Sequence, residues 1–487
     1  MAVSQHALRH PDFGHVVSLL VVIGAGATLT VGPPWAVILL GLSAATLCGV
    51  LLYRLAGSSI FGIEVPLVLL LSSTTVWRIR SSMDLADNPL DTAGTVRIGQ
   101  ILLATLLALL ALLLPRAQTL RTPLPTPWWL YAAYILVVFL GAPLSVDAPI
   151  TAYRGVELAA GFLLLLAARR VASDGLARVE ATLYWATVVG LAAVWAGVVL
   201  FPKLAVGHLI NAPVPIPWQI QGVYPVVSSN SVGTSGVLLF FWTIGRAPHR
   251  WPGRRWRPAT LSTLGVASLL AAQYRTGYVI FAVGIVVLLA VRRRWILLIL
   301  LAALLCFLLA YKPGIVADAA PYALRGATVE QAKGLNSRIS WWSAALPAWQ
   351  ESPLLGKGLL TGTRFEVLPR LGLVDVSSIH GTWVEALVGT GIVGCGLLAL
   401  AYLLALWRSI SSADHVALLV LMVILVRSMT GSSIESFGAV GLLFLWAACP
   451  SEVRDRVAGL PTPSLVGSQN PESRMTSASH SEKSGSE

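Results

Sequence analysis

The sequence predicts an all-α polytopic membrane protein with about 14 transmembrane helices, in a range of roughly 12 to 14 at ~20 residues each. Hydrophobic residues make up 56% of the 487 residues and charged residues only 11%, whereas soluble domains carry roughly 25% charged residues. The mean hydropathy is +0.76, and the apolar residues gather in runs long enough to cross a bilayer. This composition excludes a soluble enzyme, a disordered protein and a fibrous protein.

The predicted spans follow these apolar runs, which are separated by short segments containing polar or charged residues, Gly or Pro. They lie at about 16–31, 35–53, 59–77, 98–114, 128–145, 152–168, 181–201, 229–245, 260–273, 277–291, 295–311, 383–407, 414–429 and 435–449. One long loop, residues 312–381, precedes the last three spans. A loop of this size is marginal for a core of its own, so we expect it to lie on the membrane domain.

The basic residues predict the orientation, because short cytoplasmic loops of membrane proteins collect Lys and Arg. With both termini in the cytoplasm, the cytoplasmic segments hold most of the 34 basic residues. The chain then divides into eleven spans in residues 1–311, an extracytoplasmic loop with an interfacial helix in 312–381, three spans in 382–449 and a disordered cytoplasmic tail in 450–487. This arrangement predicts a multi-pass membrane protein with both termini in the cytoplasm.

The net charge of +12 would suggest nucleic acid in a soluble protein. Here orientation charge accounts for it, and no basic run interleaves with aromatic residues in a soluble segment, so we expect no nucleic acid. Basic loops such as residues 246–257 and 292–294 could also contact anionic membrane lipids. The four cysteines lie in or beside apolar runs and have no metal-ligand spacing, so we expect neither disulfides nor a metal site.

Ionisable residues within or beside the spans are the first functional candidates, because they are costly in a membrane. Arg154 and Glu157 are three residues apart, so they can pair on one helix face, which is the structural alternative to a functional role. Glu64 has no partner that the sequence identifies. The others stand at span ends, namely Arg275, Glu385, Arg427 and Glu435.

The long loop contains the strongest pattern. Residues 337–350 place apolar side chains at spacings of three or four, and three tryptophans suit a helix at the membrane interface. Arg338 would lie in the first turn of this helix. The segment 353–358, Pro-Leu-Leu-Gly-Lys-Gly, then turns the chain, and His380 stands where the chain re-enters the membrane.

These motifs resemble those of the O-antigen ligase and O-antigen polymerase family of bacterial envelope membrane proteins. The family pattern is an Arg-led helix, then Pro-Leu-Leu-Gly-x-Gly, then a His followed by Gly at eleven and fourteen residues, here Gly391 and Gly394. Arg275 matches an outer family arginine, with Tyr274 in place of the usual Ser. Gly381 departs from the Asn, Ser or Gln that usually follows the His. The resemblance covers residues 275 to 394.

The resemblance implies glycosyl transfer from a polyprenyl-pyrophosphate-linked glycan, here undecaprenyl pyrophosphate or a similar lipid, to a sugar hydroxyl on another glycan or glycolipid. Arginines match phosphate oxygens and can stabilise the pyrophosphate leaving group without a metal. A neutral histidine can accept the proton of the attacking hydroxyl. We therefore predict His380, Arg338 and Arg275 as catalytic residues and Arg275, Arg338, Arg364 and Glu385 as substrate-binding residues, with no cofactor.

Simpler explanations exist for each residue. Arg338 could be a snorkelling interfacial residue, Arg275 a helix-end anchor and His380 a helix-start residue bonded to the backbone. A multi-pass transporter or lipid-linked glycan flippase is the alternative function, and a structural membrane protein is a third. No Asp-x-Asp pair and no phosphate-binding Gly-rich ATPase loop is present. The motifs do not separate a ligase from a polymerase.

Overall fold

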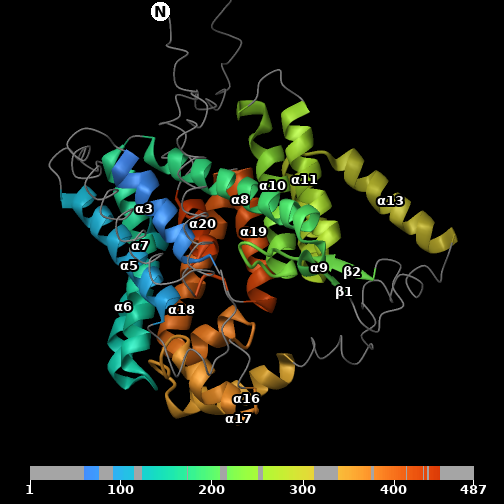
Figure 1. Ribbon diagram of the computed structural model, residues 1–487. Coiled ribbons are helices and arrows are strands. Elements are labelled where there is room, and N and C mark those ends of the chain that lie inside the picture. The colour runs from blue at the N-terminus through green and yellow to red at the C-terminus, as the bar shows by residue number, and fades with distance from the viewer. Residues whose placement is uncertain are drawn as a thin grey trace, which may run out of the picture.

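The computed structural model describes residues 60–75, 91–113, 123–172, 174–208, 217–250, 256–311, 338–373, 378–412, 414–431, 433–435 and 438–449. In these ranges the protein is a helical bundle with one short hairpin (Figure 1). The predicted spans 16–31 and 35–53 and the predicted tail 450–487 lie outside the described residues. An all-α membrane protein fits this fold.

The first half of the bundle consists of long helices and the segments that join them. They are α3 (Ile60–Ser73), α5 (Thr92–Leu113), α6 (Thr126–Gly141) with the 3-10 turn η2 (Ala142–Leu144), α7 (Ala148–Val171) and α8 (Gly175–Leu200). After α8 the chain forms the short helix α9 (Pro202–Ala205) and an antiparallel hairpin of β1 (Val206–His208) and β2 (Trp218–Ile220), in which Gly207 pairs with Gln219.

The second half contains the helices that build the candidate site. They are α10 (Ser229–Arg250), α11 (Trp256–Ala272), α12 (Arg275–Val291), α13 (Trp295–Tyr311), α16 (Arg338–Glu351), the π-helix η3 (Gly362–Val367), α17 (Leu368–Arg370), α18 (Thr382–Ser411), α19 (His415–Thr430) and α20 (Ala439–Ala447). Figure 1 shows α16, η3 and α17 as a layer at one end of the bundle, below α18.

Helices coincide with all the predicted spans that fall in the described residues. Five of them are long and apolar enough to cross a membrane: Thr92–Leu113, Thr126–Leu144, Ala148–Val171, Gly175–Leu200 and Thr382–Ser411. Shorter apolar helices include Arg275–Val291 and His415–Met429. The predicted span 435–449 begins later than expected, because α20 starts at Ala439. The total number of spans stays a prediction.

Aromatic side chains fill the centre of the bundle, where α6, α18 and α20 meet. Trp128 and Tyr131 of α6 are buried, and the Trp128 indole donates to the Leu445 carbonyl at 2.8 Å. Tyr402 of α18 stacks on Phe444 of α20 with ring centroids 6.2 Å apart. These contacts make α18 a central helix of the fold.

Buried carboxylates pair with arginines across the bundle. Arg154 pairs with Glu157 at 2.5 Å, as the spacing predicted, and Arg97 of α5 adds a second contact at 2.7 Å. Glu64, for which the sequence offered no partner, pairs with Arg178 of α8 at 2.6 Å. These ion pairs hold neighbouring helices together, so Glu64 and Arg154 need no catalytic explanation.

Candidate functional site

Helix α18 is broken near the end that carries the predicted histidine. Gly391 has φ 64° and ψ −169°, outside helical geometry, and divides α18 into the half-helices 382–390 and 392–411. A Cβ atom on Gly391 would lie 2.2 Å from the Leu354 carbonyl oxygen. Only glycine fits here, because the φ value is left-handed and the segment 353–358 approaches the backbone directly.

The segment 353–358, which we name the inserted segment, lies against this break. The N–H groups of Lys357 and Gly358 donate to the carbonyls of Val388 and Gly389 at 2.8 and 3.0 Å. The two carbonyls end the first half-helix and would otherwise have no partner. An unsatisfied backbone group in a membrane interior costs several kcal/mol, so the inserted segment stabilises the break.

The second half-helix gains its missing partners from the same segment. Ile392 N–H donates to the Pro353 carbonyl at 2.8 Å, and Val393 N–H to the Leu354 carbonyl at 3.4 Å. In an unbroken helix these two N–H groups would bond to carbonyls four residues earlier. The Pro-Leu-Leu-Gly-x-Gly motif and Gly391 therefore form one structural unit, which no single motif in the sequence indicates.

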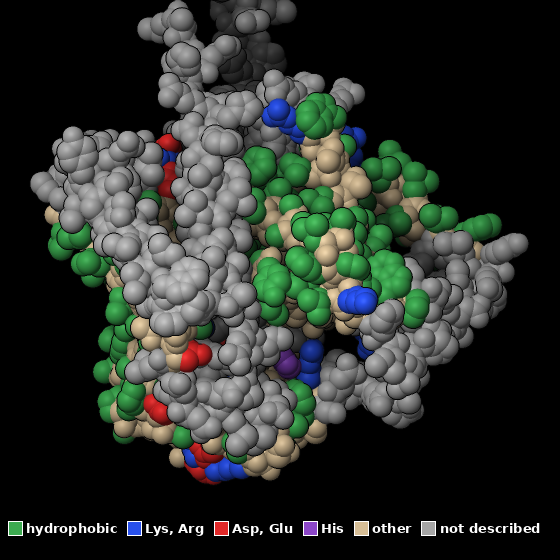
Figure 2. Space-filling model, viewed as in Figure 1, with side chains coloured by type: hydrophobic (Ala, Val, Ile, Leu, Met, Phe, Trp, Pro, Cys, Tyr) green, Lys and Arg blue, Asp and Glu red, His purple; other side chains and the backbone are tan. Residues whose placement is uncertain are grey.

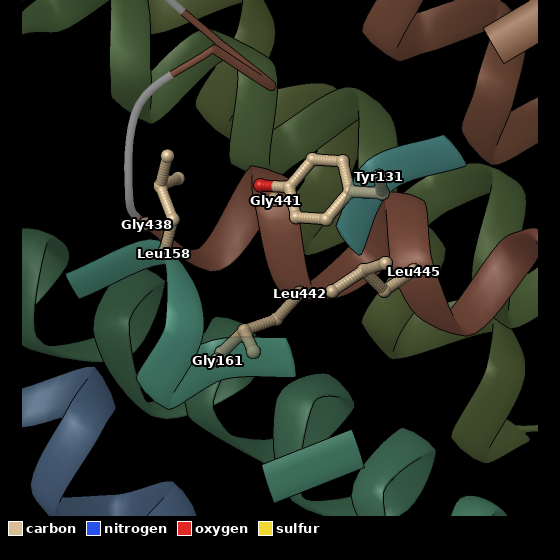
Figure 3. Close-up of a pocket in the computed structure, with 7 residues that line it drawn as sticks. All are labelled: Tyr131, Leu158, Gly161, Gly438, Gly441, Leu442 and Leu445. Carbon is tan, nitrogen blue, oxygen red and sulfur yellow. The ribbon is translucent and has the colours of Figure 1, made fainter. Parts of the chain in front are cut away.

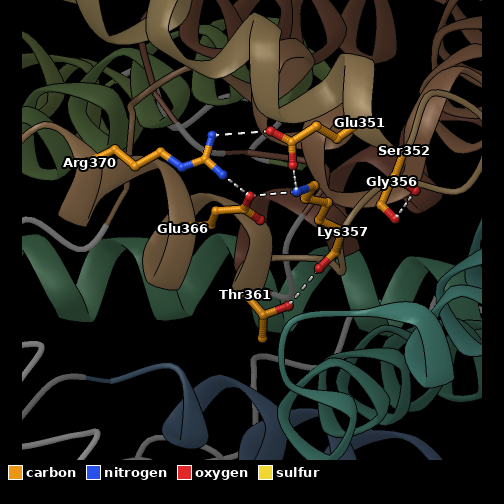
Figure 4. Close-up of polar contacts among 7 residues, drawn as sticks. All are labelled: Glu351, Ser352, Gly356, Lys357, Thr361, Glu366 and Arg370. Carbon is orange, nitrogen blue, oxygen red and sulfur yellow. Dashed lines mark hydrogen bonds and ion pairs between the residues drawn. The ribbon is translucent and has the colours of Figure 1, made fainter.

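An ion-pair network fixes the inserted segment from the other side (Figure 4). Lys357 contacts Glu351 at the end of α16 and Glu366 of η3, the latter at 2.5 Å. Arg370 contacts the same two carboxylates. Hydrogen bonds to Lys357 and then to Arg370 hold the pKa of Glu351 below its ordinary value. The network joins α16, η3 and α17 into the layer that lies next to the break.

His380 lies immediately before α18 in a strained backbone conformation, with φ 54°. Its N–H donates to Ser378 Oγ at 2.9 Å, and its Nδ1 lies 3.4 Å from the same oxygen. The Trp341 ring of α16 lies beside the imidazole, with ring centroids 6.2 Å apart. Nε2 has no hydrogen-bond partner among the described residues, so this nitrogen can meet a ligand.

The glycine after this histidine has a steric explanation. A Cβ atom on Gly381 would lie 2.8 Å from the Trp342 indole nitrogen. That nitrogen donates to the Ile379 carbonyl at 3.1 Å and so holds the chain next to His380. The departure from the family pattern therefore makes room for Trp342 and leaves the position of His380 defined.

Arg338 is the first residue of α16 and is half-buried close to His380. Burial, followed by the charges of Arg338 and Arg427, lowers the pKa of His380 below its ordinary value. The imidazole is therefore neutral at pH 7, the form that can accept a proton. Burial also lowers the pKa of Arg338, which the hydroxyl of Tyr274 partly offsets.

Arg275 is the first residue of α12 and reaches this region through its neighbour Tyr274. Tyr274 is buried, and a Cβ atom on Gly233 of α10 would lie 2.5 Å from the Tyr274 Cβ. Against the effect of burial, the Tyr274 hydroxyl raises the pKa of Arg338, and the charge of Arg338 lowers the pKa of His380. Arg338 and His380 are thus neighbours in the structure, Arg275 is linked to them only through the adjacent Tyr274, and its role stays a prediction.

Arg427 of α19 belongs to the same region and was missing from the predicted site. Its Nη1 donates to Thr234 Oγ1 of α10 at 2.7 Å, and its charge acts on His380. The sequence placed Arg427 at a span end but gave it no role, because only the packing of α19 against α10 and α12 brings it here. Figure 2 shows a histidine next to a basic side chain on the face of the molecule that it draws.

Helix N-termini make this region electropositive. Helices α12 and α16 each begin with an arginine, and α18 begins two residues after His380. The N-terminal residue of a helix carries part of the positive end of its dipole, so an arginine there is unfavourable for the helix itself. An arginine at a helix N-terminus is, however, suited to binding an anion, above all a phosphate.

The two other predicted substrate-binding residues are buried. Arg364 lies in the π-helix η3 with 8% of its surface exposed, and Glu385 lies in the first turn of α18 with 3% exposed. Neither has a described contact with His380. Their binding roles stay predictions.

Other possible sites carry less chemistry. The described residues contain no group of three or more His, Cys, Asp or Glu that could hold a metal ion. A small pocket between α6, α7 and α20 is lined by apolar side chains and glycines (Figure 3). Its one polar group, the Tyr131 hydroxyl, donates to the Ile434 carbonyl at 3.3 Å. The charged region around His380 is therefore the candidate site.

The fold and this site define a class: helical membrane proteins with an electropositive, histidine-containing site at the ends of their helices. The sequence model of the O-antigen ligase family matches residues 260–399, the stretch that contains Arg275, Arg338 and His380. In this stretch the chain is similar to the O-antigen ligases, a family of glycan-transferring enzymes. The resemblance predicted from the motifs is confirmed. No curated protein matches the chain.

Proposed function

We propose that this protein transfers a glycan from a polyprenyl-pyrophosphate donor to a sugar hydroxyl at the outer face of a bacterial cytoplasmic membrane. The observation that supports this most is the position of His380. Its imidazole is kept neutral beside Arg338 and Arg427, and its Nε2 is available to a ligand. Transfer of a glycan from a pyrophosphate to a hydroxyl is assisted by a base of this kind next to a site for the phosphate leaving group.

The reaction is a substitution at the sugar carbon that carries the pyrophosphate. The acceptor hydroxyl oxygen attacks this carbon, and the new carbon–oxygen bond forms as the bond to the phosphate oxygen breaks. His380 Nε2 accepts the hydroxyl proton, and the electron pair of the broken bond stays on the pyrophosphate. Arg275 and Arg338 stabilise the negative charge that develops there. The lipid tail in the membrane fixes the depth of the donor.

The orientation follows from the same proposal. The α16 layer and the N-terminal ends of α12 and α18 would face the outer side, and both chain termini would lie in the cytoplasm. The cytoplasmic ends of the bundle then carry Arg292, Arg293 and Arg294, as short inner loops usually do. Membrane lipids surround the bundle, and the acceptor approaches from the outer side.

The broken helix α18 also bears on the alternative of a transporter or flippase. Transporters often use broken membrane helices, whose free backbone groups bind the substrate. Here the inserted segment of the chain occupies those backbone groups. The backbone groups at the break therefore bind the protein's own chain and not a substrate, which favours an enzyme over a transporter.

The test is complementation of a deletion strain with wild type or His380→Ala. We expect the variant to reach the membrane at normal abundance, to lose at least about a hundredfold of transfer, and to leave the lipid-linked donor on the outer side. Accumulated single repeat units would indicate a polymerase, and accumulated long chains a ligase. Full complementation by His380→Ala would exclude the proposed base. Donor trapped on the cytoplasmic side in the deletion strain would instead indicate a flippase.

A further inference from the structure

Arg427 differs from Arg154, Arg178 and Arg246, which pair with buried carboxylates. Its Nη1 bonds to the neutral hydroxyl of Thr234 at 2.7 Å, and its Nε is buried without a hydrogen bond. Among the described residues no carboxylate lies within 4.0 Å of its guanidinium group. A half-buried charge with no ion pair is costly unless a ligand supplies the missing anion.

Hydrogen bonds tie the end of α19 to the start of α18, and this places Arg427 beside His380. Thr382, two residues after His380, is fully buried and donates to the Gly431 carbonyl at 2.9 Å. Its hydroxyl also lies 2.9 Å from Ser433 Oγ. Arg427 stands one helical turn before Gly431, so its side chain and His380 share one end of the bundle.

Glu435 is the acidic residue that comes nearest to neutralising Arg427. It is fully buried, and both of its carboxylate oxygens accept from the Ser433 N–H, at 3.0 and 2.8 Å. Its carboxylate is thus directed to the backbone of the turn between α19 and α20. Glu435 therefore forms no ion pair with Arg427 within 4.0 Å, although the two charges lie near enough to interact.

We propose that Arg427, held by Thr234, is a third anion-binding group of the site and contacts the pyrophosphate of the lipid donor. This inference rests on the proposed function for the identity of the anion. A lipid pyrophosphate joined to a sugar carries two negative charges, and a third appears when the bond to the sugar breaks. Arg427 with Arg275 and Arg338 supplies three positive charges, which match the group as it leaves.

The experiment measures binding to the full-length protein in nanodiscs, so it does not depend on transfer. The probe is farnesyl pyrophosphate, a short soluble lipid pyrophosphate, with farnesyl monophosphate for comparison. We expect Arg427→Gln to weaken binding of the pyrophosphate by about tenfold or more, the effect of one charge-assisted hydrogen bond. The monophosphate should lose less, and Arg427→Lys should restore part of the loss.

The matched control is Arg408→Gln, the same chemical change at the opposite end of α18. Arg408 is half-buried and bonds to Thr126 at 3.3 Å, far from His380 in the fold, so its loss should leave binding unchanged. Thr234→Val removes only the hydrogen bond that fixes Arg427 and should weaken binding by a smaller factor. If Arg427→Gln does not fold, Thr234→Val and Arg427→Lys carry the test.

The outcomes separate this inference from the proposed function. Wild-type binding with equal affinity in the folded Arg427 and Thr234 variants would overturn the role of Arg427 and leave the donor class standing. No binding by wild type would overturn both. A second readout is the pH profile of transfer. Arg338 and Arg427 are the charged groups that lower the His380 pKa, so Arg427→Gln should move the acidic limb to higher pH, and an unchanged profile would contradict the placing of Arg427 beside His380.

Discussion

Arginines occupy two different environments in this protein. Inside the bundle, Arg178 lies 2.6 Å from Glu64, and Arg246 lies 2.9 Å from Glu180. At the candidate site, Arg338 and Arg427 have no carboxylate within 4.0 Å among the described residues. Burial is similar in the two environments, so the difference lies in the counter-ion that the chain provides. The arginines inside the bundle are neutralised by carboxylates of the chain. For Arg338 and Arg427, we propose that an anionic ligand provides the counter-ion.

Helix dipoles strengthen the same contrast. Arg275 and Arg338 stand at the first residues of α12 and α16, where a positive charge disfavours the helix. Arg169 and Arg170 stand in the last turn of α7, where a positive charge is favourable. An arginine at the wrong end of a helix needs a reason other than stability, and ligand binding supplies one.

The largest expected effect concerns stability inside the bundle. Arg246→Gln removes the partner of Glu180, which accepts from both Nε and Nη2 of Arg246 and from the Trp242 indole. We expect a loss of about 3 kcal/mol in the free energy of unfolding, because a buried carboxylate is left without its ion pair. Thermal unfolding in detergent measures this. Transfer per folded molecule should stay at the wild-type level. A large loss of transfer would show that Arg246 is not a purely structural arginine.

The next effect is smaller in energy and concerns activity alone. Arg338→Gln should lower transfer by roughly 100-fold, because one cationic donor to the leaving group is gone. Its thermal stability should equal that of wild type or exceed it by less than about 1 kcal/mol, since the charge at the start of α16 is removed. Initial rates and unfolding curves on the same preparations test both parts. Lower stability with normal specific activity would show that Arg338 has a structural role and not a binding role.

The smallest expected effect is a shift in pH dependence. His380 acts as a base when neutral, and its pKa lies below the ordinary value through burial and the charges of Arg338 and Arg427. Transfer should therefore persist as the pH falls through 6.5 and decline only at lower pH. In Arg338→Gln the decline should begin at higher pH, and Arg338→Lys should behave as wild type. Rate–pH profiles of wild type and the two variants at saturating donor test this shift, and identical profiles would contradict it.

Much of the fold could be predicted from the sequence because lipid imposes a simple rule on helix length and hydropathy. The apolar runs predicted helices such as α7 and α18, and the spacing of Trp342 and Trp349 predicted α16. The partner of Glu64 could not be predicted, because Arg178 lies on a helix more than a hundred residues later in the chain. The break at Gly391 was hidden for the same reason, since it depends on the inserted segment.

The site could be predicted in part. His380, Arg275 and Arg338 stand out as ionisable residues at span ends within family motifs, and in the structure the charge of Arg338 acts on His380, while the role of Arg275 stays a prediction. Arg427 stands at a span end too, but no motif distinguishes it from an orientation charge. Its place beside His380 results from the packing of α19, and that information is absent from any local pattern.

The inserted segment has a consequence for how the protein is made. Synthesis proceeds from the N-terminus, so residues 353–358 leave the ribosome before α18 exists. Their hydrogen-bond partners, in residues 388–393, are synthesised later. Integration of α18 is then incomplete until this earlier segment docks into its gap. The end of the molecule that carries His380 therefore matures late, and a nascent chain stopped within α18 would hold Arg275 and Arg338 but not yet Arg427.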